Sequence, residues 1–206
     1  MGKGEATRDA ILEHAVGLAR RVGLEGLTIG RLADDLELSK SGLFAHFKSK
    51  EALQIQVLDA AAARFVAMVV RPALEVPHGE GRLRALFERW LTWERELPGG
   101  CVFMHAIVEL DDHPGPARDA LVASQRQWLA TIARAVRLAI NEGHFRPDLD
   151  AEQFAFQAYG LVLGFYHARR LLEDPRADAR VRRAFDEMIA GARALGSAVS
   201  PATDSA

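Results

Sequence analysis

Apolar residues recur three and four positions apart along nearly the whole chain, which is the pattern of helices that bury one face. No stretch of the sequence sustains the alternation of apolar and polar residues that is typical of a half-buried strand. Prolines fall between the periodic segments, where the lost backbone N–H does least harm, at positions 72, 77, 98, 114, 116, 147 and 175. The pattern therefore predicts an all-α protein of about nine helices.

The helix boundaries follow from capping residues and from the prolines. Thr28, Ser39 and Ser49 each precede a periodic segment and carry a hydroxyl that can accept a backbone N–H of the first helical turn. Gly23 follows the first segment, as expected at a helix end, and Pro72 is expected to stop the fourth. The predicted helices cover residues 7–22, 28–36, 39–45, 49–72, 81–96, 101–111, 116–142, 151–172 and 177–195.

The second and third predicted helices are short and joined by about three residues, as in a helix-turn-helix that places its second member in the DNA major groove. Lys40 and Ser41 lie in the first turn of that member, where base edges and phosphates are in reach and the helix dipole favours an anion. Gly42 and Ala45 leave room for DNA to come close. The apolar residues expected to hold this helix to its domain are Leu38, Leu43 and Phe47.

Between residues 28 and 53 the chain resembles the DNA-binding region of the TetR family of bacterial transcriptional regulators. The segments that carry the resemblance, in the order and spacing of the family, are LTIGRLADDLELS, SKSGLFAHF and KSKEAL. The resemblance implies a helix-turn-helix domain over residues 1–50 and a helical effector-binding and dimerisation domain over 51–196. The small polar residues 197–206 are expected to form a disordered tail.

The resemblance also implies DNA contacts at eight positions. Phosphates would be bound by Thr28, Ser39 and Lys50. Bases would be approached by Lys40 and Ser41, next to Gly42, and the sugar-phosphate backbone would be touched by Phe44 and His46. Residues 39–50 hold three lysines and no acid, so positive charge is concentrated where the phosphates would lie.

Two positions depart from the family pattern. Phe44 stands where members usually have tyrosine, so one phosphate hydrogen bond worth roughly 1 kcal/mol is expected to be missing. Glu37 stands where most members have glycine. The turn must therefore either hold a non-glycine residue in an unusual conformation or be built differently.

A regulator of this kind needs partners. The expected ones are a palindromic double-stranded DNA operator, a second copy of the chain and a small-molecule effector that releases a repressor. A homodimer would read two half-sites about 34 to 36 Å apart, or a multiple of that distance.

The last two predicted helices carry apolar stripes that suit the pairing of subunits. Gly160 and Gly164, one turn apart, would let another helix come close. The residues expected at the dimer interface are Leu161, Phe165, Val181, Phe185, Met188 and Ala192. The alternative is that both stripes simply close the core of one subunit.

Large apolar residues are dense in the middle of the chain, which holds all three tryptophans. Such residues at helical spacing form either ordinary core or the wall of a ligand site. The resemblance favours a ligand site, because family members typically enclose a small-molecule pocket among their middle helices, and apolar walls suit a hydrophobic or aromatic effector. The expected lining residues are Phe65, Met68, Phe87, Trp90, Phe103, Met104, Ile107, Trp128, Phe154 and Gln157.

Composition narrows the setting. The 206 residues are 49% hydrophobic, enough for a proper core, and the net charge of −2 means that affinity for nucleic acid must come from a local patch. Cys101 is the single cysteine, so an intrachain disulfide is impossible. The longest run without charged residues, 153–168, is shorter than the roughly 20 residues that a bilayer requires, and no signal-peptide core is present. We expect a cytoplasmic protein without a membrane partner.

Three alternatives remain at this level. Cys101 beside two glycines at a helix start could be a stabilised, redox-sensitive thiolate or a buried inert thiol. His105 and Glu109, one helical turn apart, could suggest a metal enzyme, yet no glycine-rich phosphate loop, HExxH or GxSxG motif accompanies them. We therefore expect no enzyme, no metal and no cofactor. The third alternative is a constitutive DNA-binding protein whose second domain only dimerises.

Overall fold

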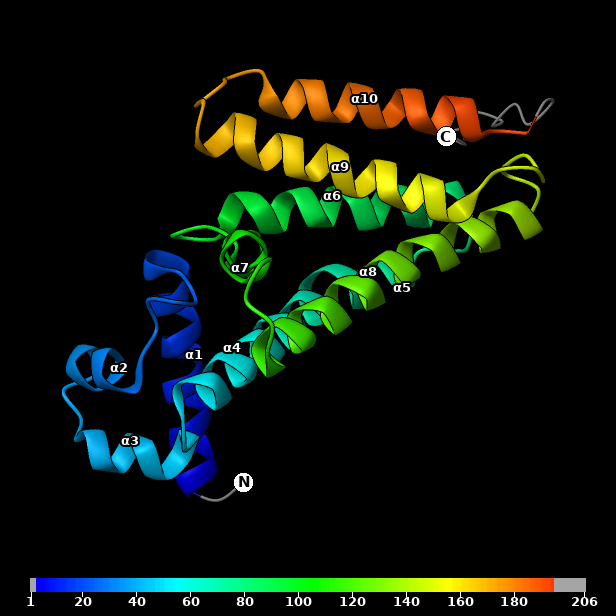
Figure 1. The fold of residues 1–206 in the computed structure, drawn as a ribbon. Helices are drawn as coiled ribbons and strands as arrows, with labels where there is room; N and C mark the ends of the chain where they lie inside the picture. Colours follow the sequence, from blue (N-terminus) through cyan, green and yellow to red (C-terminus); the bar gives the residue numbers. More distant parts are fainter. Residues whose placement is uncertain (1–2, 195–206) are drawn as a thin grey trace, which may run out of the picture. The chain divides into compact units, whose positions relative to one another are not determined.

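The computed structural model describes residues 3–194, with side chains from Arg8 onward, and over that range the chain is all-α, as predicted (Figure 1). The elements are α1 Lys3–Val22, α2 Ile29–Asp35, α3 Lys40–Phe47, α4 Lys50–Phe65, the π-helical segment η1 Val66–Val70, α5 Arg71–Leu74, α6 Glu80–Glu96, α7 Val102–Leu110, α8 Pro116–Asn141, α9 Ala151–Arg170 and α10 Ala177–Ala192. Because α4, η1 and α5 form one continuous helix, the described range contains nine separate helices. The predicted tail 197–206 and the predicted end of the last helix at 195 lie outside the described residues.

Three helix starts are set by the hydroxyl caps that the sequence predicts. The Thr28 Oγ1 accepts the Arg31 N–H at 3.1 Å at the start of α2. Ser39 and Ser49 cap α3 and α4 in the same way, each accepting the backbone N–H three residues ahead. Each cap satisfies one of the N–H groups that a helix start leaves without a partner.

Pro72 does not stop the fourth helix, contrary to the prediction. The helix passes through η1 and ends only at Leu74. In η1 the Arg71 N–H donates to the Val66 carbonyl, five residues back rather than four. This wider turn shifts the backbone hydrogen bonds by one residue just before the proline. A proline has no N–H to donate, and its ring crowds the carbonyl four residues back.

The continuous helix Lys50–Leu74 is long and apolar enough, by length and composition, to cross a membrane. This is weak evidence, because Leu53, Val57 and Ala61 on the same helix are fully buried against neighbouring helices. That burial is typical of a core helix in a globular domain.

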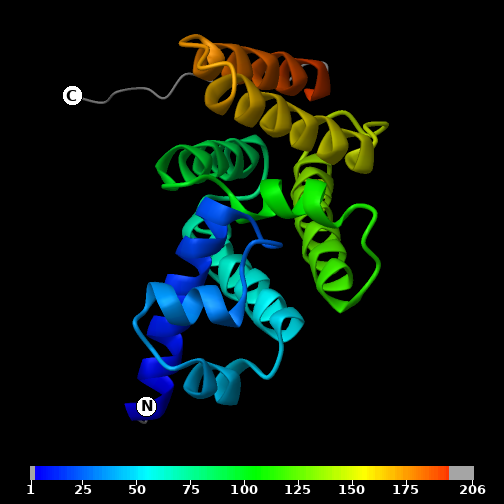
Figure 2. The ribbon, with the colours of Figure 1, turned by 60° about the vertical axis from the view of Figure 1, so that its left-hand side comes forward.

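Contacts divide the chain into two compact units, of which the first comprises Met1–Pro72 and Arg89–Trp128. In this unit α1 packs along α4, α2 packs against α3, and α7 contacts both α1 and α4 (Figure 2). The fully buried core around the short helices includes Leu24, Leu27, Leu32, Leu43, Phe47 and Leu53. The expected boundary at residue 50 is not a division between these units and stays a prediction.

The second unit comprises Ala73–Glu88 and Leu129–Ala206, and in its described part α9 packs along α10. The rings of Phe87 and Phe185 stack with centroids 3.7 Å apart and planes 3° from parallel. Phe154 meets Phe185 edge-on at 6.3 Å, which extends the same core.

Burial corrects part of the expected dimer interface. Four of its six residues are 5% exposed or less, because they pack inside their own subunit: Phe165, Val181, Phe185 and Ala192. Leu161 and Met188 are half-buried. The alternative reading, in which the stripes close the core of one subunit, therefore describes those four side chains.

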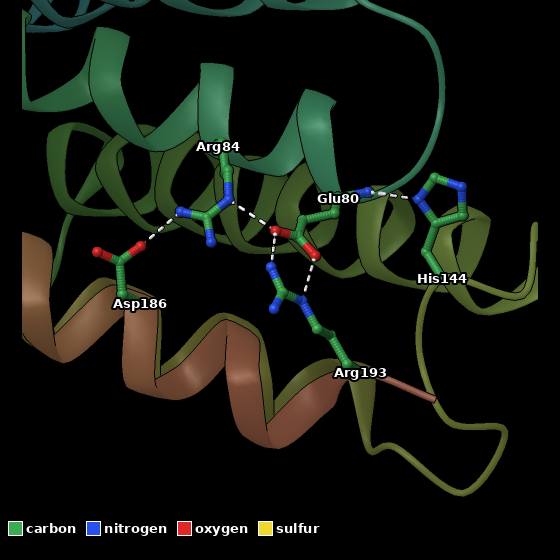
Figure 3. Close-up of polar contacts among 5 residues, drawn as sticks. All are labelled: Glu80, Arg84, His144, Asp186 and Arg193. Atoms are coloured by element: carbon green, nitrogen blue, oxygen red, sulfur yellow. Dashed lines mark hydrogen bonds and ion pairs between the residues drawn. The ribbon is translucent and has the colours of Figure 1, made fainter. Parts of the chain in front are cut away.

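A network of charged side chains joins the start of α6 to α10 (Figure 3). The Glu80 carboxylate accepts two hydrogen bonds from Arg193 and one from Arg84, all at 2.8 Å. Arg84 also donates to Asp186 at 2.5 Å, and the Glu80 N–H donates to His144 Nδ1 at 3.1 Å. The hydrogen bonds from Arg193, followed by those from Arg84, lower the pKa of Glu80 from 4.5 to about 2, although burial opposes them.

Replacing Glu80 by glutamine should destabilise the protein by about 1 to 2 kcal/mol at pH 7, because Arg84 and Arg193 would lose a carboxylate that is 13% exposed. The folded pKa lies below the unfolded one. The stabilisation is therefore complete above about pH 5 and is lost as the pH falls toward 2. Urea unfolding at pH 7, 5 and 3.5 should show the gap between wild type and Glu80→Gln narrowing at low pH. Glu187→Gln, at a position that is 74% exposed, is the control. A gap that stays constant over this range would contradict the assignment.

Candidate nucleic-acid interface and sensor core

The α3 helix buries two side chains and exposes the rest. Leu43 and Phe47 are 1% and 0% exposed, and they fix α3 to the core of the first unit. The other six residues of Lys40–Phe47 are exposed and form one continuous surface with Ser39. Leu38 does not join the core, contrary to expectation, because it is 46% exposed at the edge of this surface.

The predicted DNA-contacting residues gather around the start of α3. Ser39, Lys40, Ser41, Gly42, Phe44 and His46 are all exposed there. A Cβ on Gly42 would lie 3.0 Å from the Ser39 Oγ, so the glycine also protects the cap. The Lys40 Nζ lies 4.0 Å from Asp34, an exposed pair that leaves the ammonium accessible.

Thr28 and Lys50 flank this surface. The Thr28 hydroxyl caps α2, as described above, and its side chain is half-buried. The Lys50 Nζ donates to Glu25 Oε2 at 2.9 Å, and this hydrogen bond is the main cause of the lowered pKa of Glu25. A phosphate at Lys50 would therefore replace a carboxylate.

The turn between α2 and α3 holds Glu37 in the left-handed region, with φ of 55°. Of the two possibilities left by the sequence, the structure has the first, a non-glycine residue in an unusual conformation. The Leu38 N–H donates to the Ala33 carbonyl at 2.9 Å and closes the end of α2. The left-handed conformation of a residue with a Cβ costs roughly 1 to 2 kcal/mol.

A carboxylate from α7 holds the turn between α1 and α2. Glu109 Oε2 accepts the Leu24 N–H at 2.7 Å and the Glu25 N–H at 3.0 Å. The carboxylate lies where a side chain on Gly23 would be, since a Cβ there would come within 1.9 Å of Glu109 Oε1. Glu109 thus has a structural role, and no group of three metal-binding side chains was found among the described residues.

Sequence reasoning missed this contact. The sequence indicates Glu109 only as a neighbour of His105, because the donors that it binds are backbone groups, which carry no sequence signature. The one available signal was Gly23 at a helix end, and that glycine is equally explained by its φ of 79°.

Aromatic side chains of α4, α6 and α8 cluster in the first unit around Phe65. Its ring meets Trp128 at 4.8 Å, Trp93 at 5.4 Å and Trp90 at 6.5 Å, all edge-on. Trp90 and Trp128 also meet edge-on at 5.0 Å. The structure thus brings together three of the expected lining residues, Phe65, Trp90 and Trp128, and adds Trp93.

The remaining expected lining residues have different environments. Phe103 and Met104 are buried in the first unit and Ile107 is half-buried. Met68, 43% exposed, and Gln157, also exposed, lie on the outside of the subunit, contrary to expectation, because each occupies the outer face of its helix. Phe87 and Phe154 belong to the ring cluster of the second unit.

A hollow of about 210 Å³ lies on the second unit and is lined by Arg84, Glu88, Arg182, Phe185 and Asp186. Four of these five residues are charged, unlike the aromatic wall expected for the effector. The ion pairs Arg84–Asp186 and Arg182–Glu88 neutralise that lining.

Cys101 stands at the start of α7 and is 2% exposed. Burial, followed by the nearby Glu94, raises the pKa of its thiol far above the usual range. The thiol is therefore protonated at neutral pH, which matches the inert alternative and not the stabilised thiolate.

Sequence models of known protein families match both the N-terminal and the C-terminal part of the chain. A sequence model described as "Tetracyclin repressor-like, C-terminal domain" matches residues 79–185, and one described as "Bacterial regulatory proteins, tetR family" matches residues 11–57. The HTH-type transcriptional regulator TcmR of Streptomyces glaucescens is 30% identical over 162 residues, which are 76% of this chain and 71% of that protein.

Two solved structures share the fold. A TetR transcriptional regulator from Chloroflexus aurantiacus superposes with a TM-score of 0.81 at 26% identity, covering 92% of this chain and 96% of that one. AibR in complex with isovaleryl coenzyme A and operator DNA superposes with a TM-score of 0.66 at 25% identity, covering 85% of this chain and 96% of that one.

Replacing Glu37 by glycine should stabilise the protein by about 0.5 to 1 kcal/mol. The gain is the relief of left-handed strain less the greater entropy of glycine in the unfolded chain. The melting temperature should rise by about 1 to 4 °C. Glu37→Ala removes the same carboxylate but keeps the Cβ, and it should give no gain. Equal effects of the two variants would mean that charge, and not conformation, matters here.

Replacing Glu109 by alanine should destabilise the protein by about 1 to 3 kcal/mol, because the Leu24 and Glu25 N–H groups would lose their acceptor. Amide hydrogen exchange at these two residues of the turn should accelerate relative to the residues of α1. Glu96→Ala, at an exposed position of α6, is the control and should leave both measurements unchanged. Unaltered exchange at Leu24 in Glu109→Ala would show that Glu109 does not hold this turn.

Proposed function

Because this chain belongs to the TetR family of bacterial transcriptional regulators, we propose that it is a homodimeric repressor that a small, largely apolar effector releases from a palindromic operator. The observation that carries the proposal is the two-sided character of α3. One side is anchored by Leu43 and Phe47, and the other presents Lys40, Ser41 and Phe44 on an unobstructed surface.

At the DNA, α3 enters the major groove with its first turn toward the base edges. Lys40 and Ser41 read bases, and the neighbouring glycine allows close approach. Phe44 is 56% exposed and has no hydroxyl, so it packs against sugar without donating to a phosphate. Lys50 exchanges its ion pair with Glu25 for one with a phosphate, which contributes to DNA affinity independently of the base sequence.

The coupling between effector and DNA runs through α4 and α7. The α4 helix is unbroken from the cap at Ser49 beside α3 to Phe65 in the aromatic cluster, a span of about 24 Å. The α7 helix holds the turn after α1 through Glu109. An effector that enters among the rings changes the packing of α4 and α7, and with it the orientation of α3. AibR, with a coenzyme A thioester and operator DNA in one crystal, supports such a pair of partners.

The dimer partner lies against the outer face of α9. Phe156 is 70% exposed and Leu163 is 39% exposed, and both share a face with Gly160 and Gly164. Nothing lies within 4 Å of a Cβ placed on either glycine, so a second helix has room to approach closely. This face takes the place of the buried Phe165 and Phe185 in the interface expected from the sequence.

Titration of a fluorescent duplex from the promoter beside the chain's own gene, at two salt concentrations, tests DNA binding. Lys50→Ala should weaken binding to every duplex and reduce the slope of log affinity against log salt by about 0.9 per lost phosphate contact. Ser41→Ala should instead change the preference at particular base pairs. Arg183→Ala removes an exposed charge from α10 and is the control. Uniform losses for all three variants, or no salt dependence, would reject the proposed orientation of α3.

A thermal melt against a panel of lipophilic compounds tests the effector. Binding to the folded state should raise the melting temperature in a concentration-dependent way, and the same compound should dissociate the duplex. If the chain binds its operator but no compound has either effect, the alternative of a constitutive DNA-binding protein holds.

A further inference from the structure

The lysine expected to bind a phosphate at the start of α4 is paired with a carboxylate of the same subunit. The Lys50 Nζ donates to Glu25 Oε2 at 2.9 Å, and Glu25 lies in the turn between α1 and α2. This hydrogen bond lowers the pKa of Glu25, so the carboxylate is ionised at neutral pH. DNA that approaches Lys50 therefore meets an ammonium whose charge already has a partner.

The second oxygen of the Glu25 carboxylate is held by α4 as well. Gln54 Nε2 donates to Glu25 Oε1 at 3.3 Å and to the Leu24 carbonyl at 2.9 Å, and Gln54 is 4% exposed. Lys50 and Gln54 are four residues apart and share one face of α4. The carboxylate thus lies over the first turn of α4 with one oxygen on each of these side chains, and the buried amide keeps it directed at Lys50.

The backbone of Glu25 is fixed by a third helix. Its N–H donates to Glu109 Oε2 of α7 at 3.0 Å, beside the Leu24 N–H at 2.7 Å. An exposed ion pair is normally weak, because two flexible side chains must be held in one geometry. Here Gln54 and Glu109 already hold Glu25, so less conformational entropy is lost when Lys50 pairs with it.

The ion pair is nevertheless accessible to a ligand from outside. The Lys50 and Glu25 side chains are 41% and 51% exposed, beside the surface of α3. A phosphate can therefore reach the ammonium. Because the phosphate and the Glu25 carboxylate have the same sign of charge, each makes the other's contact with Lys50 less favourable.

From this arrangement we propose that Glu25 is an internal competitor for the phosphate site at Lys50, and that it lowers the affinity of the chain for DNA of every sequence. A phosphate at Lys50 either breaks the ion pair with Glu25 or shares one ammonium with a second anion. Phosphates carry no sequence information, so this loss is the same on the operator and on any other duplex. The proposal rests on the proposed DNA-binding function and assigns a role in it to a residue outside the predicted DNA contacts.

A built-in competitor suits a regulator that must leave its operator. An effector can dissociate the complex only by as much as it prefers the DNA-free state. The tighter the DNA is held, the larger that preference has to be. By weakening a contact that carries no sequence information, Glu25 lowers the affinity that the effector has to overcome and leaves the base contacts of α3 unchanged.

Titration of the promoter duplex and of a scrambled duplex with Glu25→Gln tests the proposal. Glutamine keeps the shape of the side chain and removes its charge. Both duplexes should be bound about three- to tenfold more tightly than by wild type at the same salt concentration, because a dimer carries two such pairs. A gain on the promoter duplex alone would mean that Glu25 affects base contacts, and it would overturn the proposal.

Glu51, the exposed residue that follows Lys50 in α4, provides the matched control. Glu51→Gln removes the same charge from the same turn but leaves the pair of Lys50 and Glu25 intact. It should change the affinity for either duplex by less than about twofold, because salt screens exposed charges. Equal gains in Glu25→Gln and Glu51→Gln would show general repulsion of DNA instead of competition at Lys50.

A double-mutant cycle shows whether the gain depends on Lys50. In the Lys50→Ala background, Glu25→Gln should leave the affinity for both duplexes within about twofold, because the contested ammonium is absent. The full gain in that background would mean that Glu25 acts on DNA without Lys50, and the proposal would fail.

Thermal melts distinguish competition from a structural role. Glu25→Gln should melt within about 2 °C of wild type, because an exposed pair contributes little stability and the backbone N–H still reaches Glu109. If Glu25 mainly holds the turn, the variant should melt well below wild type and bind DNA more weakly, which overturns the proposal.

Failure of this proposal can be told apart from failure of the function on which it rests. A wild-type chain that ignores the promoter duplex overturns the proposed function itself. A wild-type chain that binds the duplex, while Glu25→Gln binds it equally or more weakly, overturns only the role of Glu25.

Discussion

The hydrogen bonds from the turn after α1 to Glu109 determine how the helix-turn-helix is built into the chain. Two consecutive N–H groups, of Leu24 and Glu25, have their acceptor on a helix 85 and 84 positions away in sequence. Glu25 in turn binds Lys50 and Gln54 at the start of α4. This one turn therefore links α1, α4 and α7. A shift of α7 either moves the helix-turn-helix with it or breaks these hydrogen bonds.

The parts of the structure that the sequence predicted are those with local causes. Thr28, Ser39 and Ser49 cap helices because a hydroxyl next to a helix start meets an N–H three residues ahead, whatever the rest of the chain does. The strain at Glu37 was likewise predictable as one of two outcomes, since the turn needs a left-handed residue. The prediction that Pro72 ends the helix was wrong because of the π-helical turn before it, which shifts the backbone hydrogen bonds by one residue. Such a turn has no sequence signature.

The parts that could not be predicted depend on packing between distant segments. The apolar stripe of α10, predicted to contact a second subunit, packs against Phe87 of the same subunit. Periodicity shows that a helix has an apolar face but does not show what that face packs against. The sequence likewise predicts one set of aromatic lining residues, yet Phe65 with the tryptophans and Phe87 with Phe154 belong to different clusters. The surface of α3 was predictable because its residues are contiguous, whereas the aromatic cluster around Phe65 is assembled from α4, α6 and α8.

A regulator must be stable without being fixed in one state, and its first unit shows how the two demands coexist. The core around Leu43 and Phe47 is fully buried, which holds α3 in a defined shape for the groove. The contact between α1 and α6 is different, since the Nε and Nη2 atoms of the buried Arg20 form no hydrogen bond there and its guanidinium lies 5.8 Å from the centre of the Trp93 ring. A buried polar atom without a hydrogen bond makes the folded state less stable. A ligand shifts a conformational equilibrium only by its differential affinity for the two states, so tight packing alone does not make a core responsive.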